Sequence, residues 1–121
     1  MSKRILVVED RPDNRQIIRD MLAPDDYEIT EAENGEQALA AIAKQRPDLI
    51  LMDIQLPIMD GYEATRRIKA DASLRAIPII AVTSYALSGE GQKARVAGCD
   101  DYVPKPFSPR QLLAKIRQYL S

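Results

Sequence analysis

The sequence of 121 residues contains no histidine and only one cysteine, Cys99. Without histidine, the chain can form neither a Ser-His-Asp or Cys-His catalytic triad nor a histidine-ligated metal site. A single cysteine allows no disulfide within the chain and no zinc cluster built from cysteines. We therefore interpret Cys99 as a small residue of the core and not as a redox centre.

An excess of one charge and a long apolar run are also missing. Lys and Arg number 17 against 18 Asp and Glu, which leaves a net charge of −1. This balance gives nucleic acids and anionic membranes no overall electrostatic attraction. The apolar run at residues 5–8 is too short for a secretory signal, and no run approaches the roughly 18 residues of a membrane span. These absences predict a cytoplasmic protein that binds neither nucleic acid nor membranes.

The sequence does contain a regular alternation of short, β-branched apolar runs with helical patterns. Its length suits one domain, residues 1–121, and 45% hydrophobic with 29% charged residues predicts a packed core under a charged surface. Strands are expected at residues 5–8, 27–32, 49–52, 77–82 and 101–103. Runs that are apolar throughout predict burial on both faces, as in a parallel sheet covered by helices on both sides. With right-handed crossovers, the favoured fold is a doubly wound α/β domain of five β-α units.

Helices are expected between these strands, and most of them follow a recognisable start signal. The signals are Asp13 with Gln16, Asn34 with Gln37, Asp60 with Gly61, and Ser108 with Pro109 and Gln111. The first helix is expected to bury one apolar face, formed by Ile17, Ile18, Met21 and Leu22. The segment 84–97 predicts only a short or mobile helix, because serine and glycine at positions 88, 89 and 91 weaken its pattern.

Four of the five expected strands are followed by charged or hydroxyl side chains that together suit one site. Glu9 and Asp10 follow the first run, Asp53 follows the run at 49–52, Thr83 follows the run at 77–82, and Lys105 comes after the last. Ligands of such sheets bind at the carboxyl ends of the strands, so we expect these side chains to converge. Crowded acids cannot all stay ionised without a counter-charge, and one lysine offsets only one of them. Hard oxygen ligands suit Mg²⁺, and Asp53, fixed at the end of a buried strand, is the best candidate for a nucleophile.

Several segments carry motifs in a recognisable order. They are 5–10 (ILVVED), 47–53 (PDLILMD), Pro57 with Asp60 and Gly61, 80–83 (IAVT), and Lys105 with Pro106. In order and spacing, essentially the whole chain resembles the receiver domain of bacterial two-component response regulators. The resemblance implies a flavodoxin-like (βα)5 domain whose parallel strands have the order 2-1-3-4-5. No output domain follows within these 121 residues, so the chain resembles the single-domain regulators or a receiver taken from a longer protein.

The resemblance implies a phosphoacceptor beside a metal ion. Asp53 would accept the phosphoryl group. Mg²⁺ would be held by Asp10 directly, by Glu9 through water, by Asp53, and by the backbone carbonyl of Gln55. The chain would then be a phosphorylation-dependent switch and not an enzyme. Because it contains no histidine, a partner histidine kinase or histidine phosphotransferase would supply the phosphoryl group.

The resemblance also implies which residues respond to phosphorylation. Thr83 and Lys105 would bind the phosphoryl oxygens, the Lys105–Pro106 bond would be cis, and Tyr102 would move between exposed and buried positions. We expect a downstream protein to read a surface formed by residues 84–97, Tyr102 and residues 109–120. The chain is expected to be a monomer or a weak dimer.

Two other functions are left open by the residues themselves. Residues 89–94 fit a loose glycine fingerprint of a nucleotide-binding module, although they come late in the chain and not in the first β-α turn. A phosphohydrolase could use Asp53 as its nucleophile, but it would need a positioned acid or base, and Glu9 is the only spare acid. Labelling by an acyl phosphate would be stoichiometric for a switch, whereas an enzyme would turn the compound over continuously.

Overall fold

The computed structural model describes residues 2–83 and 97–120 of the chain. These residues form the strands β1 (Arg4–Val8), β2 (Glu28–Ala32), β3 (Leu49–Asp53), β4 (Ile79–Thr83) and β5 (Asp101–Pro104). Every neighbouring pair of strands is parallel, and the order across the sheet is β2-β1-β3-β4-β5. The predicted α/β fold and its strand order are therefore confirmed.

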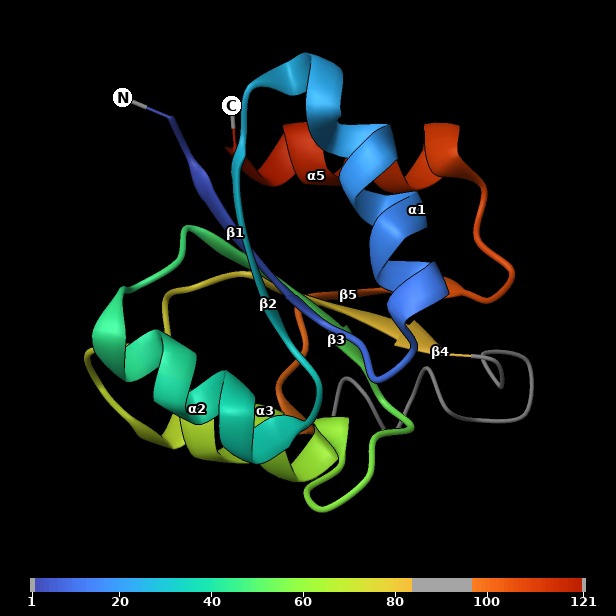
Figure 1. The fold of residues 1–121 in the computed structure, drawn as a ribbon. Helices are drawn as coiled ribbons and strands as arrows, with labels where there is room; N and C mark the ends of the chain where they lie inside the picture. Colours follow the sequence, from blue (N-terminus) through green and yellow to red (C-terminus); the bar gives the residue numbers. More distant parts are fainter. Residues whose placement is uncertain (1, 84–96, 121) are drawn as a thin grey trace.

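Helices cover both faces of this sheet. The described helices are α1 (Pro12–Leu22), α2 (Gly35–Lys44), α3 (Gly61–Ala70) and α5 (Pro109–Leu120), with a short 3-10 turn, η1 (Ala23–Asp25). The helices α1 and α5 lie on one face, and α2 and α3 lie on the other (Figure 1). The helix expected at 84–97 falls almost entirely outside the described residues. None of the helices named here is long and apolar enough to cross a membrane.

The central strands are apolar at successive positions because each face of the sheet has its own core. The side chains Ile5, Val7, Leu49 and Leu51 pack with α1 and α5. Their neighbours Leu6, Val8, Ile50 and Met52 pack with α2 and α3. Burying each such side chain contributes about 1.5–3 kcal/mol, so β1 and β3 are anchored from both sides. The residues that follow these two strands therefore start from a fixed backbone.

The predicted start signals of α2 and α3 are confirmed by their hydrogen bonds. Asn34 Oδ1 accepts a bond from the Gln37 backbone N–H at 2.9 Å, and Gln37 Oε1 accepts one from the Glu33 N–H at 2.9 Å. Asp60 Oδ1 accepts a bond from the Glu63 N–H at 2.9 Å. Caps of this kind contribute about 1 kcal/mol each and fix where a helix begins.

The predicted start signal of α1 is wrong. The helix begins at Pro12, directly after Arg11, and no side chain caps its first turn. Asp13 lies inside that turn, and the Gln16 side chain donates instead to Asp20 Oδ1 at 2.8 Å. Proline at the first helical position already has a helical φ and has no N–H to satisfy. The helix therefore starts without the expected capping pair.

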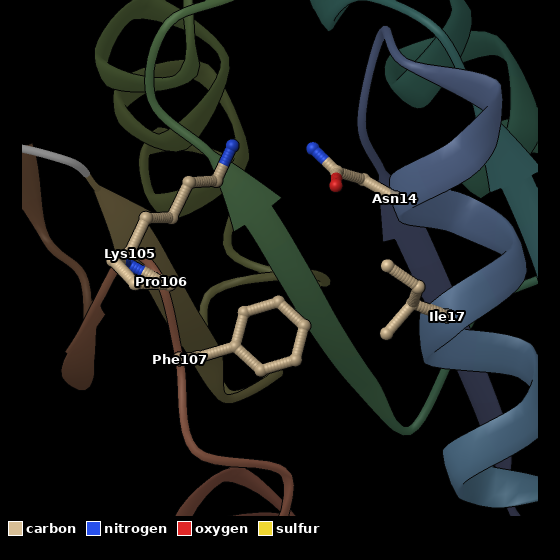
Figure 2. Close-up of a pocket in the computed structure, with 5 residues that line it drawn as sticks. All are labelled: Asn14, Ile17, Lys105, Pro106 and Phe107. Atoms are coloured by element: carbon tan, nitrogen blue, oxygen red, sulfur yellow. The ribbon is translucent and has the colours of Figure 1, made fainter.

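One apolar residue of α1 lies outside the core, contrary to the prediction. Ile18 and Leu22 are buried beneath the helix, whereas Ile17 is 49% exposed. Successive helical residues point about 100° apart, so Ile17 cannot share the full buried face of Ile18. Its side chain instead lines a cavity together with Phe107 (Figure 2).

Candidate functional site

Asp53 is the last residue of β3 and is only 3% exposed. A Cβ atom on Gly61, at the start of α3, would lie 2.3 Å from the Asp53 carbonyl oxygen, so only glycine allows this close approach. The Gln55 backbone N–H donates to Asp53 Oδ1 at 3.1 Å, and Lys105 Nζ donates to Oδ2 at 2.9 Å. Both the backbone and the carboxylate of Asp53 are therefore held in place.

Glu9 follows β1 and is buried to the same degree, with 3% of its surface exposed. Its Oε2 accepts a bond from Lys105 Nζ at 3.1 Å, so one ammonium joins the carboxylates of Glu9 and Asp53. Its Oε1 accepts bonds from Asn14 Nδ2 at 3.1 Å and from the Arg11 backbone N–H at 3.3 Å. Glu9 is thus held between the start of α1 and the connection that follows β5.

Asp10 completes an acidic cluster and is exposed to solvent. One carboxylate oxygen from each of Glu9, Asp10 and Asp53 lies within 4.8 Å of the others. The ammonium of Lys105 can neutralise only one of these three charges. Mg²⁺ prefers carboxylate oxygens and usually keeps several of its waters, for which the exposed side of Asp10 leaves room. The donor set therefore fits Mg²⁺.

Protonation follows from the crowding of these acids. Burial, together with the neighbouring Glu9, raises the pKa of Asp53 to about 7, because Lys105 offsets only part of their effect. Burial acts on Glu9 in the same direction, but hydrogen bonds from Asp53 and Asn14 and the charge of Lys105 outweigh it and lower the pKa of Glu9. As the pH falls through about 7, the proton is therefore taken up by Asp53 while Glu9 stays ionised. A cation bound at this cluster would compete with that proton.

The neighbouring strand end brings a hydroxyl group to the same edge. Thr83, the last residue of β4, is buried and follows Val82, which pairs with Asp53 across the sheet. The Lys105 backbone N–H donates to the Thr83 carbonyl at 2.7 Å, which ties the chain after β5 to β4. The Lys105–Pro106 peptide bond is cis, as predicted.

A cavity of about 320 Å³ lies beside the carboxylates. It is lined by Asn14, Ile17, Lys105, Pro106 and Phe107. Figure 2 shows the nitrogen atoms of Lys105 and Asn14 extending toward one another, while the ring of Phe107 faces Ile17. The cavity therefore has a polar end next to Glu9 and Asp53 and an apolar wall beyond it.

The predicted site residues fall into two groups in space. Glu9, Asp10, Asp53 and Lys105 lie together, and Gln55 reaches Asp53 through its backbone N–H. Tyr102 lies on β5, where it is half-buried against the core cluster on the α2 and α3 side. The roles assigned to these residues remain predictions.

Asn14 is a contact of the site that the sequence reasoning missed. It donates to Glu9 from the first turn of α1. The available signal was its place four residues after Asp10 on the helix that follows the acidic pair. This spacing identifies Asn14 only if α1 is known to begin at Pro12, and the expected capping pair placed the start of the helix later.

A lysine and an acidic cluster at the carboxyl edge of a five-stranded parallel sheet are the features of a receiver-type domain. Residues 5–117 of the chain match the response regulator receiver domain, and the chain belongs to this family. Members of the family act as phosphoacceptor switches, bind Mg²⁺ at an acidic site, and interact with histidine kinases or phosphotransferases and with downstream targets.

Individual relatives agree with this assignment. The polar-differentiation response regulator DivK of Brucella anthropi is 42% identical over 120 residues, which cover 99% of this chain and 98% of that protein. The receiver domain of a sensor histidine kinase from Pseudomonas aeruginosa is 41% identical, with a TM-score of 0.90 and 98% of both chains covered. That structure has a magnesium ion coordinated in its active site cleft. The chemotaxis response regulator CheY4 of Vibrio cholerae is 28% identical, with a TM-score of 0.91 over 98% of this chain and 99% of that one.

Proposed function

We propose that the protein is a phosphorylation-dependent switch of a two-component phosphorelay, in which Asp53 accepts a phosphoryl group from a phosphohistidine of a partner. The partner is a histidine kinase or a histidine phosphotransferase, because this chain has no histidine. One observation carries the proposal: Asp53 is buried at the end of β3, bonded to Lys105, and within 4.8 Å of two further carboxylates. A carboxylate nucleophile, a cation site and a lysine are the groups that aspartyl-phosphate formation needs. The proposed setting is the cytoplasm, with residues 1–121 acting as one receiver domain.

The transfer step makes one bond and breaks another. An ionised oxygen of Asp53 bonds to phosphorus, while the bond from phosphorus to the partner imidazole breaks and the imidazole leaves with that electron pair. Lys105 turns its ammonium from the carboxylates toward the phosphoryl oxygens, and the Thr83 hydroxyl binds them from the adjacent strand end. These contacts compensate the charge of about −1.5 to −2 that the phosphoryl group adds.

The cation site draws on the same cluster. Asp10 and Asp53 would hold Mg²⁺ directly, Glu9 would hold it through water, and the Gln55 backbone carbonyl would add a further ligand. When bound, the ion neutralises charge on the phosphoryl group and orients it for attack. The charge of the three acids against one lysine supports this assignment.

The cavity next to Lys105 supports docking of the phosphorylated partner. Ile17 and Phe107 form its apolar wall, and Ile17 is 49% exposed. A histidine that reaches Asp53 must bring its neighbouring residues over this wall, where apolar side chains of the partner would be buried. Interfaces are typically centred on such apolar contacts with polar groups at the rim.

The output surface is proposed to differ from this docking face. Tyr102 lies on β5 just before Lys105, and α5 follows shortly after it; the Lys105 N–H is bonded to the Thr83 carbonyl. Movement of Thr83 and Lys105 toward a phosphoryl group would therefore be transmitted to β5 and Tyr102. Residues 84–97 belong to the same proposed surface, although 84–96 lie outside the described part of the chain. A target that prefers one arrangement shifts the population toward it.

The two alternative functions receive less support. A phosphohydrolase needs a free acid or base, but both oxygens of Glu9 already accept hydrogen bonds. The residues of the glycine fingerprint at 89–94 lie outside the described part of the chain. The first β-α turn, which a nucleotide-binding module would use, contains Arg11 and Pro12 in place of glycine.

Labelling with an acyl phosphate and Mg²⁺ tests the proposed function. The expected result is one phosphoryl group per chain, measured by intact mass, and no label on the Asp53→Asn variant. Continuous release of inorganic phosphate at a constant high rate would instead identify a hydrolase. Label that persists on the variant would exclude Asp53 as the acceptor.

A further inference from the structure

Arg15 is an α1 residue whose side chain is mostly buried, with 14% of it exposed. Its NH1 donates to the backbone carbonyl of Glu9 at 2.8 Å. Its Nε lies 3.1 Å from Glu31 Oε1 on β2, and its NH2 lies 3.6 Å from Glu33 Oε1. The side chain thus connects the end of β1 to the end of β2, and it binds the backbone of Glu9 but none of the three clustered carboxylates.

The carbonyl that Arg15 binds determines the direction of the next residue. The Glu9 N–H donates to the Ala32 carbonyl at 3.0 Å, so β2 fixes that side of Glu9. Beyond this bond the chain leaves the sheet, and Arg15 binds the Glu9 carbonyl instead. A peptide unit is planar, so fixing its carbonyl also fixes the nitrogen of Asp10. Arg15 therefore restrains the peptide that leads into Asp10, whose carboxylate has an oxygen within 4.8 Å of one from Asp53.

We infer that Arg15 is a positioning residue for the divalent-cation site: it holds the Glu9–Asp10 peptide so that both carboxylates face the ion. The inference rests on the proposed function, because it assigns Arg15 to the cation site proposed there. Glu31 contributes to this positioning, because its ion pair with Arg15 keeps the guanidinium group directed toward the Glu9 carbonyl. Residues that hold metal ligands in this way typically change metal affinity by about 10- to 100-fold when replaced.

The sign of the effect separates positioning from simple electrostatics. Arg15 is a cation near a cation site, so removing its charge should by Coulomb's law strengthen Mg²⁺ binding. Loss of positioning should weaken it. Weaker binding by an Arg15→Gln variant therefore cannot come from the lost charge.

Arg19 provides a matched control one helical turn further along α1. Its NH1 lies 2.6 Å from Glu31, so it pairs with the same carboxylate as Arg15. Its other described bond goes to Gln16, and not to Glu9. Arg19→Gln removes the same charge and an ion pair to the same glutamate, but leaves the Glu9 carbonyl bonded.

The experiment is a Mg²⁺ titration of the wild type, Arg15→Gln, Arg15→Lys and Arg19→Gln, followed by amide chemical shifts at fixed ionic strength and a pH well above neutral. We expect Kd to rise about tenfold for Arg15→Gln, and by less for Arg15→Lys, whose single ammonium cannot reach Glu31 and the Glu9 carbonyl together. Arg19→Gln should stay within about twofold of the wild type. At saturating Mg²⁺, labelling of both Arg15 variants by an acyl phosphate should recover to the wild-type level, because Arg15 touches no reacting group.

Unchanged or tighter binding by whichever Arg15 variant is folded would overturn the inference. Equal weakening by Arg19→Gln would also overturn it, because the loss of affinity would then be caused by the lost charge on α1 or the lost ion pair with Glu31, and not by the lost bond to the Glu9 carbonyl. Failure of the proposed function has a different signature, because the wild type itself would then bind no Mg²⁺ at the acidic cluster.

Discussion

The pKa of Asp53 predicts a steep pH dependence of Mg²⁺ binding. Burial and the neighbouring Glu9 raise this pKa to about 7, and the cation requires the ionised carboxylate. The apparent Mg²⁺ affinity is therefore highest well above this pKa and weakens as the pH falls through it. At about pH 6 roughly nine-tenths of the metal-free protein carries the proton, so the apparent Mg²⁺ affinity should be about tenfold weaker than well above neutral.

Calorimetry can measure both parts of this prediction. Titrations at about pH 6 in two buffers of different ionisation enthalpy should show that nearly one proton is released per ion bound, and far less than one at about pH 8. The Asp53→Asn variant lacks both the titrating group and a proposed ligand, so at Mg²⁺ concentrations high enough for it to bind the ion it should release far less than one proton at about pH 6. A wild-type Kd that is equal at both pH values, with no proton released, would refute the raised pKa of Asp53.

The same raised pKa predicts how the stability of the metal-free protein depends on pH. The folded state keeps a proton on Asp53 that the unfolded state loses above the ordinary pKa of 3.8. The contribution of Asp53 to the free energy of unfolding should therefore fall as the pH rises from about 4 to about 7, and not increase. The shift from 3.8 to about 7 corresponds to at most about 4 kcal/mol, part of which the lowered pKa of Glu9 offsets.

Three further predictions concern the metal, the partner and the output. Replacing Asp10 by alanine should weaken Mg²⁺ binding strongly, because it removes the most accessible carboxylate of the cluster; an unchanged Kd in a titration would contradict the site. Ile17→Asp should slow phosphoryl transfer from a phosphorylated histidine phosphotransferase while leaving labelling by an acyl phosphate intact, and equal slowing of both would place Ile17 outside the docking face. Beryllofluoride with Mg²⁺ should change amide exchange in residues 84–97, around Tyr102 and in residues 109–120; changes confined to 13–22 and 36–46 would show that the output surface lies elsewhere.

Much of the fold could be predicted because its signals are local. The central strands are apolar at each position, which only burial on both faces explains, and Asn34 and Asp60 cap their helices through bonds within three residues of sequence. The cluster of acids followed from the same logic, since parallel strands end at one edge. Boundaries were less accurate. Ile77 is buried like a strand residue, but its N–H donates to the Leu74 carbonyl, so β4 begins only at Ile79.

The contacts that the sequence did not predict depend on tertiary geometry. Whether Asn14 and Arg15 face Glu9 depends on the residue at which α1 starts, and Pro12 moved that start away from the expected capping pair. The exposure of Ile17 has the same origin, because a helical face shifts by about 100° per residue. Sequence periodicity shows that a helix has an apolar face, but it does not determine how the helix is rotated about its axis against the sheet.

The central claim is that the Asp53 carboxylate is the phosphoryl acceptor, and the most direct measurement is the site of covalent labelling. The wild type and Asp53→Asn would be incubated with an acyl phosphate, with and without Mg²⁺, and the label located by peptide mass spectrometry after reductive trapping of the acyl phosphate. The account predicts one labelled peptide, containing Asp53, that depends on Mg²⁺ and is absent from the folded variant. Label on another residue, or equal labelling of Asp53→Asn, would contradict it.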